Sequence, residues 1–256
     1  MLKTLSRREV VAGIAVGVPL AAVLADPLLA RAVAQTLETV TITTQGGRRV
    51  SGALAVPAKT PASAVLLIHE WWGLNDQIKS VAAELAGVGY LALALDLYQG
   101  RVATTRKDAR SYMQSVDTDT ATDTATAWAQ WLKGHPRGTG RLGTIGWCFG
   151  GGWSLNVSIA HPADATVVYY GRVEKPAADL KSLKGPVLGH FATRDKWINR
   201  DMVRKFEAAM KTAGKTYTSH WYEADHGFAN PTGARYDAAD AKLARQRTLA
   251  FFKANL

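Results

Sequence analysis

The chain has 256 residues, of which 47% are hydrophobic and 20% are charged, and its formal net charge is +10. This is the composition of an ordinary globular protein, and the length suits one large α/β domain or two small ones. The basic residues are scattered and form no stripe interleaved with exposed aromatic side chains, which argues against a nucleic-acid partner.

Residues 1–34 have the features of an export signal. Basic residues open the chain, an apolar run follows over residues 10–24, and small residues precede the expected cleavage point at Ala34. The pair Arg7-Arg8 is typical of a twin-arginine signal, which exports folded proteins. The alternative is an uncleaved anchor, but the apolar run is short and interrupted by glycines and a proline. We expect the export machinery as a partner, cleavage near Ala34, no stable membrane anchor afterwards, and a periplasmic or secreted domain of residues 35–256.

Strands and helices are predicted to alternate along that domain. Residues 39–43 and 49–56 alternate well enough for an antiparallel hairpin. Further strands are predicted at 64–68, 90–95, 142–145, 165–170, 186–191 and 216–222. Helices are predicted at 76–86, 104–115, 117–133, 153–160, 200–212 and 236–252. The alternation predicts a single α/β domain with a mostly parallel twisted sheet, helices on both faces, and sites at the carboxyl ends of strands.

The stretch Gly146-Trp147-Cys148-Phe149-Gly150 matches the nucleophile elbow, with cysteine in the place of the usual serine. A sharp strand-to-helix turn needs small neighbours and exposes the thiol near the first N–H groups of the helix. Cys148 is the only cysteine, so no internal disulfide can form. A free cysteine is often just a small buried hydrophobe. A lone thiol on an elbow is nevertheless better explained by reactivity.

Two further residues follow the elbow in the order acid, then histidine. Asp195 comes after the strand predicted at 186–191, and His226 follows the last strand. Together with Cys148 they have the chain order of an α/β-hydrolase triad, in which the histidine activates the nucleophile and the acid orients the histidine. Asp201 and Asp225 are the rival acids, but a sequence neighbour of His226 cannot easily reach back to its ring.

The segment His69-Glu70-Trp71-Trp72 ends the strand at 64–68, where hydrolases of this architecture place half of the oxyanion hole. We expect the backbone N–H groups of Trp71 and Phe149 to be the donors. Glu70 is unusual there, since a carboxylate would repel an oxyanion. It either pairs with Arg101 or acts as a base toward Cys148, and a solvent-facing position is the less favoured reading.

From Val40 to Phe252 the chain resembles the dienelactone hydrolase family, the carboxymethylenebutenolidases. The matching segments are His69-Glu70-x-x-Gly73-Leu74-Asn75, Leu95-Asp96-Leu97-Tyr98, Gly146-x-Cys148-x-Gly150-Gly151, Tyr169-Tyr170-Gly171, Asp195 and His226-Gly227-Phe228. The resemblance implies a triad of Cys148, His226 and Asp195. It also implies that Glu70 deprotonates the thiol only after substrate has entered.

The chain departs from the family at the arginines that hold the substrate carboxylate. Arg101 is displaced by one extra residue, and Asn230 stands where the second arginine would be. The candidate substrate-binding residues are Arg101, Trp72, Tyr98 and Asn230. The loss of one arginine removes a bidentate carboxylate clamp, which puts the dienelactone substrate itself in doubt.

These observations predict an exported, monomeric hydrolase that cleaves a lactone or small ester through an acyl-thioester on Cys148. No metal-ligand cluster or dinucleotide fingerprint is visible, so no metal or cofactor is expected. The alternatives are a non-catalytic binding or thiol-sensor protein on a hydrolase scaffold, and a cysteine peptidase on the same fold.

Overall fold

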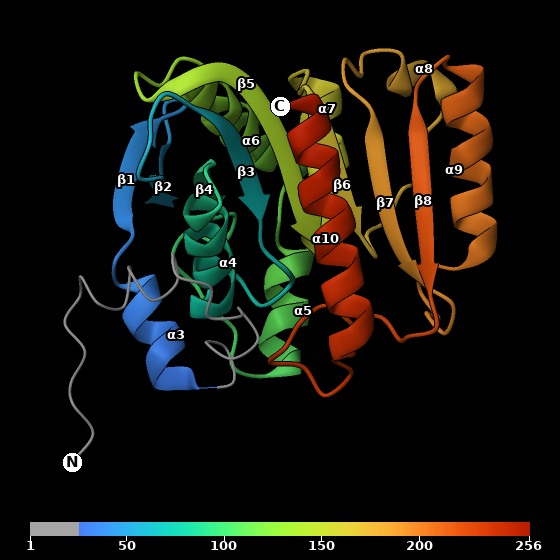
Figure 1. The fold of residues 1–256 in the computed structure, drawn as a ribbon, viewed down its shortest axis with the longest axis horizontal. Helices are drawn as coiled ribbons and strands as arrows, with labels where there is room; N and C mark the ends of the chain where they lie inside the picture. Colours follow the sequence, from blue (N-terminus) through green and yellow to red (C-terminus); the bar gives the residue numbers. More distant parts are fainter. Residues whose placement is uncertain (1–25) are drawn as a thin grey trace.

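Eight strands form one sheet in the computed structural model, which describes residues 26–256 (Figure 1). The strands are β1 (Glu38–Thr43), β2 (Arg49–Ala55), β3 (Ala62–Ile68), β4 (Leu91–Leu95), β5 (Gly138–Trp147), β6 (Ala165–Tyr169), β7 (Val187–Ala192) and β8 (Tyr217–Tyr222). The helices are α3 (Pro27–Ala34), α4 (Asp76–Gly87), α5 (Arg106–Gln114), α6 (Thr118–Lys133), α7 (Phe149–Ala160), α8 (Ala177–Leu180), α9 (Arg200–Thr212) and α10 (Ala238–Asn255).

The strand order is β1-β2-β4-β3-β5-β6-β7-β8. The pairs β1–β2 and β2–β4 are antiparallel, and the pairs from β4 to β8 are parallel. Ile68 pairs with both Leu95 and Gly146, so the carboxyl ends of the three central strands lie at one level. The loops that follow the parallel strands therefore gather at a single edge of the sheet, at the lower edge in Figure 1. This is the predicted single-domain α/β fold with a mostly parallel sheet.

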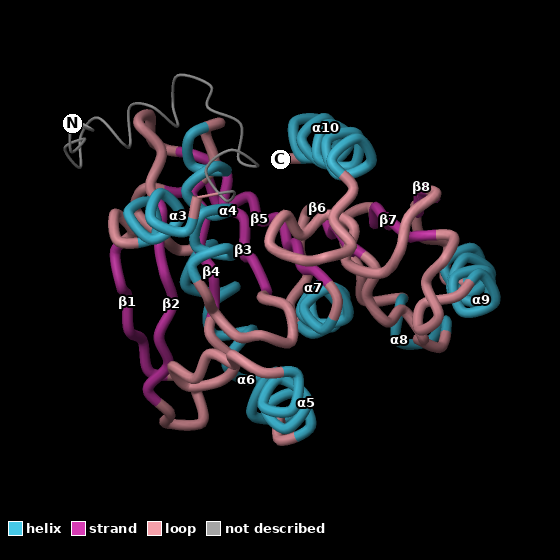
Figure 2. The backbone as a smooth tube through the Cα atoms, turned by 90° about the horizontal axis from the view of Figure 1, so that it is seen from below, coloured by secondary structure: helices cyan, strands magenta, loops and turns pink. Residues whose placement is uncertain are grey.

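Helices cover both faces of the sheet, as Figure 2 shows. On one face, apolar residues of α4 and α10 pack against the sheet, among them Ile78, Leu85 and Phe252. On the other face, α6 and α7 contribute Trp128 and Trp153, and α8 and α9 extend this layer over β7. The strands buried on both faces are the continuous apolar runs, such as Val65 to Ile68, which are fully buried.

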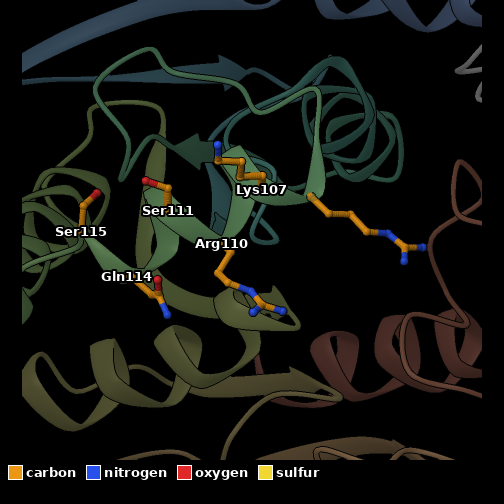
Figure 3. A pocket seen from close by; sticks show the side chains of 6 residues that line it. Lys107, Arg110, Ser111, Gln114 and Ser115 are labelled. Atoms are coloured by element: carbon orange, nitrogen blue, oxygen red, sulfur yellow. The ribbon is translucent and has the colours of Figure 1, made fainter.

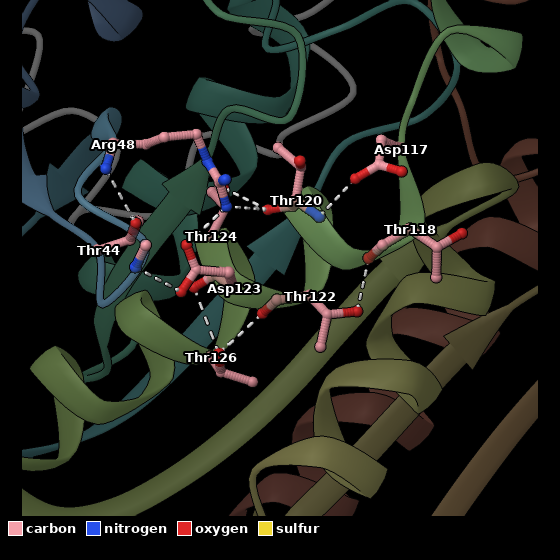
Figure 4. A network of polar contacts seen from close by, with 10 residues as sticks. Thr44, Arg48, Asp117, Thr118, Thr120, Thr122, Asp123, Thr124 and Thr126 are labelled. Atoms are coloured by element: carbon pink, nitrogen blue, oxygen red, sulfur yellow. Dashed lines mark hydrogen bonds and ion pairs between the residues drawn. The ribbon is translucent and has the colours of Figure 1, made fainter.

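Helix α6 forms from a segment rich in threonine, which is a weak helix former. Its N-cap Asp117 accepts a hydrogen bond from the backbone N–H of Thr120, at 2.8 Å. Thr122, Thr124 and Thr126 donate their hydroxyls to carbonyls four residues earlier (Figure 4). Arg48, in the turn between β1 and β2, forms an ion pair of 2.6 Å with Asp123 and fixes the hairpin to this helix.

Two helices were not expected from the sequence. The short α8 has only four residues, too few to show a helical period. The longer α3 falls within the segment expected to be an export signal. Its Ala30 and Val33 are buried, and the helix packs against α4, where the Ser80 hydroxyl donates to the Ala30 carbonyl. The basic start and the apolar run of that segment lie outside the described residues.

Candidate active site

Cys148 lies at the turn between β5 and α7, with φ of 55° and ψ of −118°. Residues other than glycine rarely adopt this backbone conformation. Close packing around the turn holds Cys148 in it despite the strain. A Cβ at Gly146 would collide with the carbonyl of Gly150, and a Cβ at Gly150 would collide with the carbonyls of Ile68 and His69. The glycines therefore let β5, α7 and the end of β3 approach each other, and the half-buried thiol is left at the sheet edge.

Asp195 and His226 contact each other although they follow different strands. Nδ1 of His226 donates to Oδ2 of Asp195 at 2.6 Å. The other carboxylate oxygen accepts from the backbone N–H groups of Trp197 and Ile198, at 2.8 and 3.1 Å. With Nδ1 committed to the carboxylate, Nε2 is the ring nitrogen that remains for another partner.

The rival acids have other partners. Asp225 forms an ion pair of 3.5 Å with Arg194, and Asp201 forms one of 2.9 Å with Arg204 within α9. Both pairs are solvent-exposed. Among these three carboxylates, only Asp195 is buried and contacts the imidazole.

The pKa of His226 reflects competing effects. Burial lowers the pKa, but the hydrogen bond to Asp195 and the interactions with Cys148 outweigh burial and raise the pKa to about 10. The imidazole therefore carries a proton at neutral pH.

Cys148 and His226 line one cavity, whose volume is about 750 Å³. Aromatic and other apolar side chains make up much of its wall, and basic side chains are the largest group among the others. Its lining also includes Trp71, Arg106, Arg110, Met113, Gln114, Phe149, Gly152, Trp153, Asn156, Tyr170, Arg172, Glu174, Lys175, Trp197, Ile198 and Arg235. The volume is in the range of small-molecule sites.

The two residues expected to form the oxyanion hole border the same cavity. Phe149 is the first residue of α7, and Trp71 lies just after β3. Within residues 26–256, neither backbone N–H donates a hydrogen bond. Two N–H groups without an acceptor beside a nucleophile can stabilise an oxyanion.

His69 holds the backbone beside Trp71. The backbone N–H of Leu97 donates to Nε2 of His69 at 3.2 Å, so Nδ1 carries the ring proton and donates to the Glu70 carbonyl at 2.6 Å. Burial lowers the pKa of this histidine, which keeps the ring neutral and able to accept from Leu97. The ring thereby ties the loop after β3 to the loop after β4.

Glu70 is buried and does not pair with Arg101. Its Oε2 accepts from the Asn230 amide at 2.5 Å, and its Oε1 accepts from the Tyr170 hydroxyl at 3.4 Å. The backbone N–H of Thr232 donates to Oδ1 of Asn230 at 2.9 Å, so the amide must present its NH₂ group to Glu70. Burial raises the pKa of Glu70, and the two hydrogen bonds oppose that rise.

Arg101 is held elsewhere. Its Nε donates to the Tyr98 carbonyl at 3.1 Å, and its guanidinium stacks 4.5 Å above the Tyr112 ring. The predicted alternative of an ion pair with Glu70 is therefore wrong. The loop folds back on itself because Asp96 accepts from the backbone N–H groups of Tyr98 and Gly100.

None of the four expected substrate-binding residues is among the lining residues of the cavity. Tyr98 is fully buried, and Trp72 packs edge-on against Trp71 with ring centroids 5.0 Å apart. Asn230 uses its amide to hold Glu70. Trp72 and Tyr98 each contact a residue of the cavity wall, Trp71 and Phe149 respectively.

Several lining residues were not singled out from the sequence. Tyr170, at φ of 36°, joins Glu70 and His226, its ring centroid lying 5.1 Å from the imidazole. Trp197 is 59% exposed and meets the His226 ring edge-on at 5.2 Å. The only signal for Tyr170 was its place in Tyr169-Tyr170-Gly171 at the end of a predicted strand, and an exposed loop tryptophan has no signal of its own.

In the described part of the chain, no group of three or more His, Cys, Asp and Glu side chains is arranged to hold a metal ion. The helices of residues 26–256 are also too short or too polar to cross a bilayer.

Comparisons with known proteins agree with this fold. Residues 50–256 match the model of the dienelactone hydrolase family. The carboxymethylenebutenolidase of Pseudomonas putida is 28% identical over 225 residues, which cover 84% of this chain and 95% of the relative. Carboxymethylenebutenolidase 1 of Cupriavidus pinatubonensis is 25% identical and covers 82% of this chain and 94% of the relative.

A solved structure shows the same fold. The dienelactone hydrolase-like promiscuous phosphotriesterase P91 from metagenomic libraries superposes with a TM-score of 0.77 at 22% identity. The match covers 86% of this chain and 98% of that one. The family match over most of the chain indicates a hydrolase that acts on ester or lactone bonds. This chain therefore belongs to the dienelactone hydrolase family.

Proposed function

We propose that this chain hydrolyses a lactone or a small carboxylic ester through a covalent acyl-thioester on Cys148. The observation that carries the proposal is the cavity, which joins the thiol on its strained turn to an imidazole bonded to a buried carboxylate. A nucleophile, an imidazole that transfers protons and a carboxylate that orients it are the three groups that a triad uses for acyl transfer.

In the first half-reaction, the Cys148 sulfur attacks the carbonyl carbon, and a C–S bond forms. The backbone N–H groups of Trp71 and Phe149 stabilise the oxyanion. The bond to the alkoxide then breaks, and protonated His226 donates its proton to the leaving oxygen. Water attacks the thioester in the second half-reaction, which releases the carboxylic acid and restores the thiol.

Glu70 supplies a second proton acceptor in this scheme. With a pKa near 10, His226 already holds a proton at neutral pH and serves as the acid. The thiol proton then needs another acceptor once substrate has entered. Glu70 is buried under the same wall, and its raised pKa makes its carboxylate a stronger base than an exposed glutamate.

The proposal is tested with p-nitrophenyl acetate. Wild type should release nitrophenol and carry one acetyl group in the mass spectrum of the quenched protein. Cys148→Ala should show neither, with turnover reduced at least about a thousandfold, because the nucleophile is gone. Asp201→Asn, a surface change on α9, is the matched control and should retain wild-type turnover.

Three outcomes would contradict the proposal. Full turnover by Cys148→Ala would exclude the thiol as nucleophile. An absence of thiol-dependent release would favour a binding or thiol-sensor protein, and cleavage of peptides in preference to esters would favour a peptidase.

A further inference from the structure

The cavity at Cys148 is strongly basic. Besides His226, its lining includes five cationic side chains, Arg106, Arg110, Arg172, Lys175 and Arg235, and a single acidic one, Glu174. Arg172 pairs with Glu174 at 3.4 Å. Within residues 26–256 the other four cations form no ion pair, so the cavity carries positive charge without a partner from this chain.

These cations come from three separate segments. Arg106 and Arg110 belong to α5, Lys175 lies in the loop between β6 and α8, and Arg235 lies in the loop between His226 and α10. None of them occupies a position where the family resemblance implies an arginine. Arg101 is stacked on Tyr112 outside the cavity, and position 230 is asparagine.

Helix α5 presents its charges in two rows. Arg106, Arg110 and Gln114 are spaced at i, i+4, so they lie on one side of the helix and all line the cavity at Cys148. Lys107, Ser111 and Ser115 form the neighbouring row, which borders only an adjoining hollow of about 670 Å³. Figure 3 shows Arg110 and Gln114 on one side of α5 and Lys107 and Ser111 on the other.

The charge acts at the site itself. The positive charge of Arg235 is among the influences that lower the pKa of the buried Glu70. Its guanidinium also stacks over Trp197, 5.4 Å from the ring centroid, and Trp197 contacts His226. Arg235 is thus linked through Trp197 to the reacting end of the cavity, whereas Arg106 and Arg110 come from a different element, α5.

We infer that the substrate is an ester or lactone that carries at least two carboxylates on an apolar, preferably aromatic, frame. This inference deepens the proposed ester hydrolysis and rests on it. Unpaired cations around one cavity repel one another, and a monoanion would offset only one of the four positive charges. Guanidinium groups bind carboxylates well, and Trp71, Phe149, Trp153 and Trp197 offer flat apolar walls.

The test compares three aromatic acetates, a dianion (acetoxyisophthalate), a monoanion (meta-acetoxybenzoate) and a neutral ester (meta-acetoxybenzamide). Wild-type kcat/KM should fall in that order. The double variant Arg110→Gln/Arg235→Gln should lower the ratio of dianion to neutral kcat/KM about tenfold. Because each ester is compared between wild type and variant, differences in its intrinsic reactivity cancel.

Lys107→Gln is the matched control. It removes one positive charge from the same helix but from the row that does not line the cavity. The ratio should stay within about twofold of wild type, because attraction at a distance is weak and screened. An equal loss in this control, or an unchanged ratio in the double variant, would overturn the inference. Thermal melting of each variant shows that the exposed substitutions leave the fold intact.

The two proposals fail in different ways. Hydrolysis of the neutral ester through Cys148 without preference for the dianion would refute the anionic substrate and leave the ester hydrolase standing. If no ester is turned over, calorimetric titration of Cys148→Ala with acetoxyisophthalate still tests whether the cavity binds a dianion. Binding that is lost in Cys148→Ala/Arg110→Gln/Arg235→Gln supports the anion site, and an absence of binding overturns it.

Discussion

At the residue scale, the contact between His226 and Asp195 couples the candidate site to the stability of the fold. The pKa of His226 is about 10 in the folded chain, whereas an unfolded histidine has a pKa of about 6.5. A group whose pKa is higher when folded contributes stability that is fully present below the unfolded pKa. That stability is lost as the pH rises through the folded pKa.

We therefore predict that wild type loses stability relative to His226→Gln as the pH rises from about 6.5 to about 10. Each pKa unit corresponds to about 1.4 kcal/mol, so the relative loss should be on the order of 2 kcal/mol or more. Urea unfolding of both proteins across this range measures it. If the free energies of unfolding of the two proteins changed in parallel with pH, the protonated imidazole would be stabilised little by its partners in the folded chain.

Asn230 shows how a single position can change its role. The resemblance places an arginine here, which would carry a charge into the cavity. The asparagine instead turns its NH₂ group to Glu70 because Thr232 occupies its carbonyl oxygen. A neutral donor stabilises a buried carboxylate less than a cation does, which fits the raised pKa of Glu70.

At the element scale, the junction of β5 and α7 depends on backbone contacts that exclude side chains. Helix propensity alone would favour alanine over glycine at position 150 by about 1 kcal/mol. The Cβ of that alanine would overlap the carbonyls of Ile68 and His69, which belong to β3 and the loop after it. The overlap is with backbone, so the cost exceeds the gain in propensity.

Gly150→Ala should therefore lower the free energy of unfolding by about 2 kcal/mol or more and abolish most esterase activity. Gly134→Ala is the matched control, because this residue has φ of −92° and its added Cβ would come no closer than 3.7 Å to another atom. It should change stability by less than about 0.5 kcal/mol. Chemical unfolding and p-nitrophenyl acetate turnover give the two readouts, and equal effects of the two alanines would contradict the role of the junction.

At the scale of the whole molecule, helix α3 bears on the expected export signal. Cleavage after Ala34 stays a prediction, as does a location outside the cytoplasm. In the full chain, Ala30, Val33 and Ala34 are buried, with exposed fractions of 6%, 1% and 7%. Cleavage at this point would remove a helix that packs on α4.

We predict that a protein of residues 35–256 folds and keeps its activity, since the cavity is built by elements after β2. Its free energy of unfolding should be lower than that of the full chain by about 1–3 kcal/mol, the value of burying a few small apolar side chains. Urea unfolding of the two proteins, with turnover measured in parallel, checks both statements. Loss of activity with residues 1–34 would show that α3 belongs to the working domain.

The fold was predictable from the sequence because its elements are encoded locally. Apolar runs such as Val65 to Ile68 mark strands buried on both faces, and the Gly-x-Cys-x-Gly spacing marks the turn. The chain order of Cys148, Asp195 and His226 also pointed to the strand ends that meet at one edge. Short segments such as α8 gave no such signal, because four residues do not complete a pattern.

The sequence by itself determined which residue types stand at the carboxyl ends of the strands, and so the chemistry that this edge can support. Only the tertiary structure decided which side chains meet there. In the folded chain Glu70 accepts hydrogen bonds from Asn230 and Tyr170, and Arg101 stacks on Tyr112. One row of α5 lines the cavity that contains Cys148. The physical reason is that the hydrophobic pattern of a helix or strand depends only on residues that are close in the sequence. The partner of a buried charge depends instead on how distant loops pack, and a shift of a few ångströms changes that partner.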